Sequence, residues 1–137
     1  QISNIKIPEL LVEMFEDLSI EDFKHVNIEK FLNHKVDWLE KLVYLQHVES
    51  IDAVMEIAPK AIQEELQKMK DLCNETKYEN TVLAPMYYAK MLYYDELFFR
   101  VIDKNEVYAR GGRYKNEDLT SVGFAIYTDA LCDTLSR

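Results

Sequence analysis

The residue types best suited to binding chemistry gather in residues 109–126, whose sequence is ARGGRYKNEDLTSVGFAI. This stretch contains all three glycines of the chain, Gly111, Gly112 and Gly123. Glycine allows a positive φ angle, or lets another group approach the backbone closely. Arg113 follows directly, and its planar guanidinium can pair in a fork with a carboxylate or a phosphate. The run Gly-Gly-Arg-Tyr therefore indicates a site for a small anionic molecule.

Tyrosines could provide the walls of this site, because a tyrosine ring is apolar and its hydroxyl is polar. The candidate ligand-binding set is Tyr93, Tyr94, Gly111, Gly112, Arg113 and Tyr114. A purely structural alternative is equally open: the run could form a bulge or a corner of a sheet. In that alternative Arg113 would pair with an acid, and the candidates are Asp95, Glu96 and Asp129.

Other kinds of active site lack the residues that they need. Adjacent acids such as Glu64 and Glu65 point to different faces of a helix, which argues against paired-carboxylate catalysis. Ser121 has no G-x-S-x-G elbow around it, and no G-x-x-x-x-G-K-[ST] phosphate loop is present. Cys73 and Cys132 form no C-x-x-C pair, and the three histidines follow no metal-binding spacing. We expect reduced thiols, no metal and no cofactor.

Length and charge limit the possible partners. The 137 residues have the size of one domain, and 48% of them are hydrophobic. The formal net charge of −9 disfavours binding to nucleic acid. No apolar run reaches the roughly 20 residues of a membrane span, so we expect no membrane partner. Reduced thiols fit a cytoplasmic protein. Four bases gather near the glycines, which indicates an anion site or a salt-bridged sheet face; they are Arg100, Arg110, Arg113 and Lys115.

The first part of the chain, residues 1–78, is expected to form a helical module. Helix-start signals recur at Pro8, Ser19, Asn27, Ser50 and Pro59. Residues 28–46 form one long run with helical spacing of apolar residues. After Pro59 one helical stripe carries Ile62, Leu66, Met69, Leu72 and Cys73. We expect this stripe to pack in the core, and Glu64 to pair with Lys68 on the exposed face.

The second part, residues 79–137, has the aromatic and β-branched composition of strands. Lys104 and Asn105 are a short polar connection that suits a hairpin between two such runs. Phe98 and Phe99 have apolar neighbours, so their strand is expected to be buried on both faces. A further strand is predicted at 120–127 and a closing helix at 128–137.

The predicted fold class is therefore α+β, with a helical first half, a small antiparallel sheet and a closing helix. Three or four strands are few for so many aromatic residues. We therefore expect residues outside this chain, or a second chain, to complete the sheet. Because the chain begins at Gln1 and not at Met, we expect it to be a portion of a longer protein.

Three segments of the second part resemble a known family. They are YYDELFFR at 93–100, ARGGRYKN at 109–116 and SVGFAIYTDAL at 121–131. They are similar to R-G-x-x-Y-Y-T-G-x-V-F-E, G-G-R-Y-D and G-F-x-I-x-x-x-x-L. These motifs occur in this order in histidyl-tRNA synthetase and its non-synthetase paralogue, the regulatory subunit of ATP phosphoribosyltransferase. The resemblance implies a class II aminoacyl-tRNA synthetase-like core, of which this chain would be the C-terminal portion.

Departures from the motifs distinguish the two relatives. In this register Ala89 and Ala130 stand where the synthetase has arginines. Asp95 and Glu96 replace its T-G, and Arg100 replaces the acid that closes its tyrosine motif. Amino-acid activation builds charge on a phosphoryl group, and losing one preorganised donor typically costs about 2.7–4 kcal/mol. The resemblance therefore implies a protein that is not an enzyme.

By this resemblance the chain would be a non-catalytic regulatory subunit. It would form a homodimer, assemble with the catalytic ATP phosphoribosyltransferase subunit, bind free histidine in the candidate pocket, and help histidine control its own synthesis. Two alternatives stay open. One is a divergent histidyl-tRNA synthetase-like enzyme fragment, and the other is a structural interaction domain whose own side chains fill the pocket.

Overall fold

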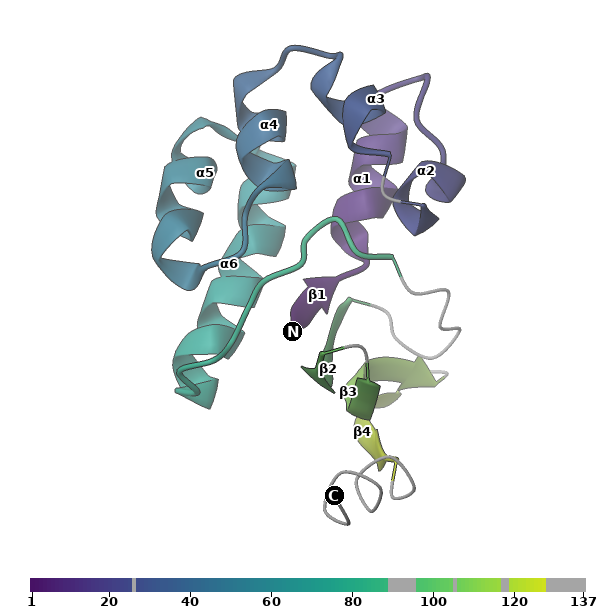
Figure 1. The fold of residues 1–137 in the computed structure, drawn as a ribbon, viewed down its shortest axis with the longest axis vertical. Helices are drawn as coiled ribbons and strands as arrows, with labels where there is room; N and C mark the ends of the chain where they lie inside the picture. Colours follow the sequence, from purple (N-terminus) through teal and green to yellow (C-terminus); the bar gives the residue numbers. More distant parts are fainter. Residues whose placement is uncertain (26, 89–95, 105, 117–118, 128–137) are drawn as a thin grey trace.

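The fold is α+β, with helices followed by an antiparallel sheet (Figure 1). A computed structural model describes residues 1–25, 27–88, 96–104, 106–116 and 119–127. The helices are α1 (Lys6–Met14), α2 (Ile20–Lys24), α3 (Ile28–Leu32), α4 (Asp37–Val43), the 3₁₀ turn η1 (Val48–Ser50), α5 (Ile51–Ile57) and α6 (Lys60–Thr76). The strands are β1 (Ile2–Asn4), β2 (Leu97–Asp103), β3 (Glu106–Asn116) and β4 (Leu119–Ile126), in the sheet order β1-β2-β3-β4. In the described residues no helix is both long and apolar enough to cross a membrane.

The helix-start signals largely predict where the helices begin. Helix α2 follows Ser19, whose backbone N–H donates to the Asp22 carboxylate at 2.8 Å in a capping box. The long run at 28–46 is not one helix, because it divides into α3 and α4 around Lys35, which has a φ of 54°. This division lets Phe31 of α3 and Leu39 of α4 both reach the core, where each is almost fully buried.

The apolar stripe of α6 lies in the core, as predicted. Ile62, Leu66, Met69 and Cys73 are buried, and Leu72 is packed against the core. The predicted pairing of Lys68 with Glu64 is wrong. Lys68 instead donates to Glu65 at 3.0 Å, one turn earlier on α6, and to Glu96 at 3.1 Å, just before β2. Helix α6 is therefore tied to the sheet by a charged side chain as well as by apolar packing.

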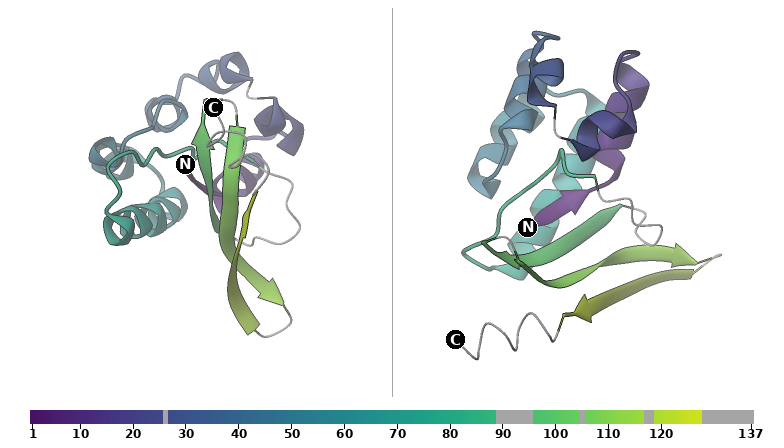
Figure 2. Two further views of the ribbon diagram at one scale, coloured as in Figure 1. Left: turned by 60° about the horizontal axis from the view of Figure 1, so that its bottom comes forward. Right: turned by 45° about the vertical axis from the view of Figure 1, so that its right-hand side comes forward.

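Strand β1 is the element that the sequence did not predict. It pairs antiparallel with β2, placing Ile2 opposite Phe99, and it also packs on α6. The predicted hairpin is confirmed, since β2 and β3 pair antiparallel on either side of Lys104. The expectation that this strand is buried on both faces is wrong: Phe98 is only 3% exposed, but Val101 and Ile102 are 50% and 38% exposed. Figure 2 shows β2, β3 and β4 extending away from the helices as a twisted sheet. The predicted closing helix, 128–137, lies outside the described residues, and the boundary at residue 78 stays a prediction.

Candidate functional site

The register of β3 divides the predicted site residues between the two faces of the sheet. Gly111 lies opposite Phe99 of β2, and Gly112 lies opposite Phe98. Opposed residues of an antiparallel pair share a face, and successive residues of a strand alternate between faces. We call the face that carries Gly111 and Arg113 the first face, and the face that carries Gly112 the second face. The two glycines therefore cannot line the same side of one pocket.

On the first face, Gly111 makes room for a side chain of its own sheet. A Cβ atom at position 111 would lie 2.5 Å from Cε1 and Cζ of the Phe99 ring and 2.9 Å from the carbonyl oxygen of Gly123. No described glycine has a positive φ angle. Of the two roles that glycine can have, the close approach is thus the one used here, and the approaching group is Phe99.

The glycine run forms neither a bulge nor a corner, so that part of the structural alternative is wrong. Residues 98–101 pair without interruption with 109–112, and the register shift of this hairpin lies between Val101 and Ile102. The ladder to β4 is also continuous from Ala109 to Asn116. The glycines therefore lie in the middle of β3, where the hydrogen-bonded ladders to β2 and to β4 both continue past them.

The other part of the structural alternative is confirmed for one of its three acids. The Arg113 Nη2 atom lies 3.5 Å from a carboxylate oxygen of Glu96, and the Arg113 side chain is about half exposed, at 49%. Glu96 also accepts a hydrogen bond from Lys68 at 3.1 Å. The remaining candidate acids, Asp95 and Asp129, lie outside the described residues. Arg113 therefore has an anionic partner already, at a distance that leaves the pair loose.

This ion pair is the outer end of a longer polar chain. Lys68 joins Glu96 to Glu65, and Glu65 accepts a hydrogen bond from the fully buried Asn4 side chain at 2.8 Å. Burial would lower the pKa of Lys68, but its hydrogen bonds to Glu65 and Glu96 outweigh burial and raise it. The chain runs from β1 through α6 to β3, so the position of Arg113 is coupled to the helices.

The second face carries two arginines that sequence analysis placed in one cluster with Arg113. Arg100 of β2 lies directly opposite Arg110 of β3. The Arg100 guanidinium stacks 4.0 Å from the Tyr87 ring centroid, and its Nε donates to the Gln1 side-chain oxygen at 2.7 Å. Strand alternation thus separates the predicted basic cluster into two groups: Arg110 and Arg113, three positions apart on β3, fall on opposite faces, and the register places Arg100 with Arg110.

Three predicted site residues cannot be placed around this geometry. Tyr93 and Tyr94 lie outside the described residues. The backbone of Tyr114 pairs with Ser121 in the β3–β4 ladder, and its side chain lies outside the described set. Among the described residues, no group of three or more His, Cys, Asp or Glu side chains is placed to hold a metal ion.

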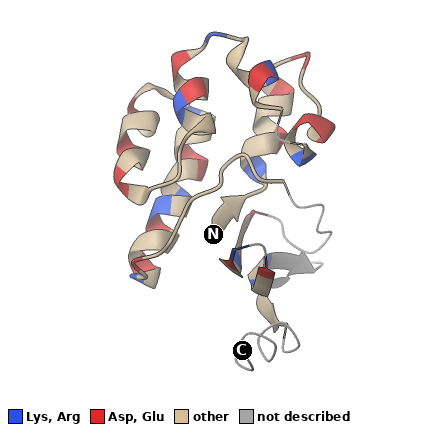
Figure 3. Ribbon diagram, viewed as in Figure 1, with Lys and Arg blue, Asp and Glu red and all other residues tan. Residues whose placement is uncertain are grey.

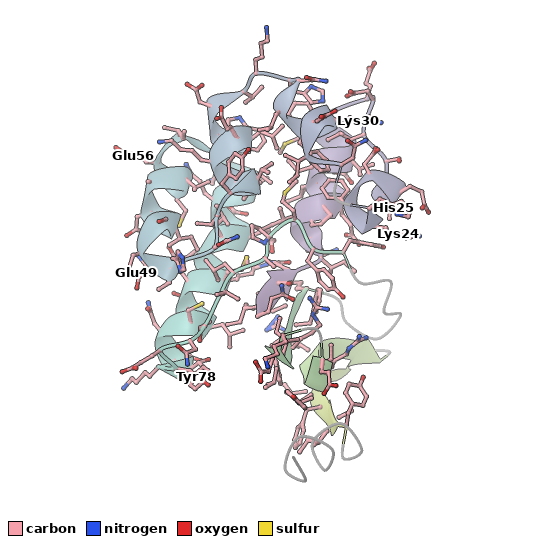
Figure 4. The ribbon with its side chains drawn as sticks, viewed as in Figure 1. Lys24, His25, Lys30, Glu49, Glu56 and Tyr78 are labelled. Carbon is pink, nitrogen blue, oxygen red and sulfur yellow. The ribbon has the colours of Figure 1, made fainter. Side chains whose placement is uncertain are left out.

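Two surface hollows occur elsewhere, and no predicted site residue lines either of them. One, of about 550 Å³, lies between α4 and α5 around Tyr44 and Val54. The other, of about 310 Å³, lies near the end of α6 around Cys73 and Tyr78. Figure 4 labels Tyr78. Acidic residues are spread over the helices that surround these hollows (Figure 3), among them Glu49 of η1. These hollows carry no chemistry that the sequence pointed to.

Comparison with known proteins tests the resemblance. The chain is 34% identical over all of its 137 residues to the ATP phosphoribosyltransferase regulatory subunit of Wolinella succinogenes. It is 35% identical over 135 residues to the protein of the same name from Helicobacter hepaticus. The chain is a homologue of both. The predicted resemblance to this regulatory subunit is thereby confirmed, whereas no family model matches the sequence.

The similarity extends over nearly all of this chain but over only part of each relative. The chain spans about half the length of the two relatives, 47% and 48% respectively. It includes the helices as well as the three motifs of the second part, since the alignment covers 98% or more of the chain. The helical residues therefore share in the relationship that the motifs of the second part first suggested.

Proposed function

We propose that the chain is part of a regulatory subunit of ATP phosphoribosyltransferase that acts without catalysis in histidine biosynthesis. The observation that carries this proposal is the similarity over the whole chain to two proteins of that name. The proposal includes a class II synthetase-like core, a cytoplasmic location, a homodimer, and assembly with the catalytic ATP phosphoribosyltransferase subunit. Helices followed by an antiparallel sheet are compatible with such a core.

The proposal of a role without catalysis rests on the residues at two motif positions. Ala89 and Ala130 replace the arginines with which the synthetase stabilises the reacting phosphoryl group. An alanine carries no charge and no hydrogen-bond donor on its side chain, so neither position can stabilise the charge that develops during amino-acid activation. Binding of a metabolite does not require those two cations.

We further propose that free histidine binds beside β3. The pocket would lie on the first face, which carries Gly111 and Arg113, with the predicted Tyr93 and Tyr94 as its walls. Gly112 and Tyr114, which the sequence also assigned to it, occupy the alternate positions of β3 and are therefore not part of this pocket. The pair formed by Arg113 and Glu96 suits the two charges of an amino acid: the guanidinium can bind its α-carboxylate, and the Glu96 carboxylate can bind its ammonium group. The N···O distance of 3.5 Å is longer than in most other ion pairs of the described residues, so this pair is held more loosely and can separate to admit such a ligand.

The test uses the full-length protein together with the catalytic subunit. We expect the two to co-elute in size-exclusion chromatography, and histidine to change the rate of ATP phosphoribosyl transfer in the complex. Arg113→Gln and Glu96→Gln should each weaken histidine binding by at least about tenfold, which corresponds to one charge-assisted contact. Asp52→Asn, which removes a surface ion pair with Lys70, is the matched control and should leave the affinity unchanged.

Two results would contradict different parts of the proposal. Robust ATP–pyrophosphate exchange by the full-length protein alone would favour the alternative of a synthetase-like enzyme. If calorimetry detects no binding of histidine, ATP or AMP below millimolar concentration while the complex still forms, the alternative of a structural interaction domain is preferred.

A further inference from the structure

The second face of the sheet places two arginines directly opposite each other on neighbouring strands. The Arg100 backbone N–H donates to the Gln1 carbonyl at 2.9 Å, on the side of β1. Its backbone groups therefore point away from β3, and Arg100 with Arg110 forms a non-hydrogen-bonded pair of the antiparallel ladder. The Cα atoms of such pairs are about 4.5 Å apart, and their side chains are closer than at the alternate positions. Two cationic side chains are thus held side by side.

Like charges directly opposite each other destabilise a sheet unless something neutralises them. In the described residues no carboxylate forms an ion pair with Arg100 or Arg110, whereas Arg113 on the first face has Glu96. The Arg110 Nε atom is buried and has no hydrogen-bond partner in the part of the chain that the structure describes. A buried donor without an acceptor is costly, so an arrangement that keeps one indicates a missing acceptor.

The contacts of Arg100 hold its guanidinium in place without neutralising it. Its flat face lies on the Tyr87 ring, and the Nε edge, with Nη2, donates to the neutral Gln1 side chain. Tyr87 in turn packs on Phe98, with the ring centroids 5.8 Å apart. These contacts use one edge of the guanidinium, and its other N–H groups make no hydrogen bond within the described residues. The side chain is therefore positioned to donate to a further acceptor.

The space beside Arg110 also differs from that of an ordinary sheet. Two residues further along β3 on the same face is Gly112, which lies opposite Gly123 of β4. Neither strand places a Cβ atom or a longer side chain at that pair. The Tyr127 ring also lies near Arg110, with its centroid 6.0 Å from the Arg110 guanidinium carbon.

We propose that the second face binds a phosphoryl anion between Arg100 and Arg110. A phosphate group matches two guanidinium groups better than a carboxylate does, because it carries up to two negative charges and offers oxygens in several directions. The unpaired N–H groups of both arginines, including the buried Nε–H of Arg110, donate hydrogen bonds to the phosphate oxygens. This site is independent of the histidine proposal, since Arg113 and Glu96 belong to the first face.

The test is calorimetric titration of the full-length protein with inorganic phosphate, at low and at high salt. We expect saturable binding that weakens as salt screens the charges. Arg100→Gln and Arg110→Gln should each reduce the affinity by at least about tenfold, the loss of one charge-assisted fork. Arg113→Gln is the matched control, because it removes the same guanidinium from the opposite face of the same strand, and it should leave phosphate binding intact.

A second measurement on the unchanged protein covers the case in which a variant does not fold. In ¹⁵N-detected NMR, phosphate should shift the Nε–H resonances of Arg100 and Arg110 and not that of Arg113. Titration with AMP and with adenosine distinguishes the sources of the phosphoryl group. Tighter binding of AMP than of phosphate, with none of adenosine, assigns a nucleotide phosphate, whereas equal binding of AMP and phosphate assigns free phosphate.

The proposal fails if phosphate binding does not saturate, or if Arg113→Gln weakens it as much as Arg110→Gln does. It fails equally if adenosine binds as well as AMP does. Failure of histidine to bind, by contrast, would leave phosphate binding unaffected. The two proposals can therefore be refuted separately.

Discussion

The contact between Gly111 and Phe99 predicts that Gly111→Ala destabilises the protein, whereas a glycine-to-alanine substitution within a strand usually stabilises it. Alanine in the interior of a strand is normally more stable than glycine by roughly 0.5–1 kcal/mol. At position 111, however, the new methyl carbon would lie 2.5 Å from two atoms of the Phe99 ring. Carbon atoms in favourable contact are about 3.5–4.0 Å apart, so the ring would have to move by 1 Å or more.

The Gly123 carbonyl oxygen, at 2.9 Å, prevents the backbone from relieving this overlap. Overpacking of this kind typically costs about 1–3 kcal/mol. After the usual gain from alanine is subtracted, Gly111→Ala should lower the free energy of unfolding by up to about 2.5 kcal/mol. Urea unfolding followed by circular dichroism measures the difference.

Two controls test whether Phe99 is the cause. Ala109→Gly, two residues away on the same face of β3, should show the ordinary preference and destabilise by about 0.5–1 kcal/mol. In a double-mutant cycle, Phe99→Leu should recover most of the loss caused by Gly111→Ala, with a coupling energy of about 1 kcal/mol or more. If Gly111→Ala stabilises the protein, as it would in an unobstructed strand, the reasoning about Phe99 is refuted.

Three further predictions concern the helical part. Asn4→Ala should destabilise by about 2–3 kcal/mol in urea unfolding, because the buried Glu65 carboxylate loses its 2.8 Å donor; an unchanged midpoint would contradict this role. Hydrogen bonding from the Ser19 backbone lowers the pKa of Asp22 below 3.8, so its stabilisation is present above the unfolded pKa and lost as pH falls through the folded pKa. Asp22→Asn should therefore reduce the loss of stability measured in acid, and an unaltered pH profile would count against the capping box. Burial raises the pKa of the Cys73 thiol, so its alkylation by iodoacetamide, followed by peptide mass spectrometry, should be much slower in native than in denatured protein. Equal rates would show that Cys73 is accessible.

The spacing of apolar residues predicted a helix well where the residues of that helix alone determine it. The stripe of α6 repeats at helical spacing, and the spacing alone predicts which of its residues are buried. The division between α3 and α4 had no such signal, because the left-handed residue there is Lys35 and not a glycine. Burial of Phe31 and Leu39 in the core decides that conformation, and burial is a tertiary property.

For the candidate site, the sequence predicted which residues take part but not how they are arranged on the sheet. The sequence located the glycines, the arginines and the acids, including Glu96 as a partner of Arg113. Alternation along β3 separates Arg110 from Arg113, but which of them shares a face with Arg100 of β2 depends on pairing register, because a shift of one residue exchanges the two faces. The same limitation hid the contact between Phe99 and Gly111, which needs β2 and β3 in register.

Strand β1 has a consequence for how the protein is synthesised. Its backbone partners come after α6 in the chain: Ile2 is hydrogen-bonded to Val82 and Ala84, and Gln1 is hydrogen-bonded to Arg100, 99 positions away. At a translation rate of about 5–20 residues per second, β1 waits about 5–20 s after leaving the ribosome before β2 is available. The helices can assemble during that interval, but the edge of β1 that pairs with β2 stays open throughout it, and an unpaired strand edge is a place where another chain can pair.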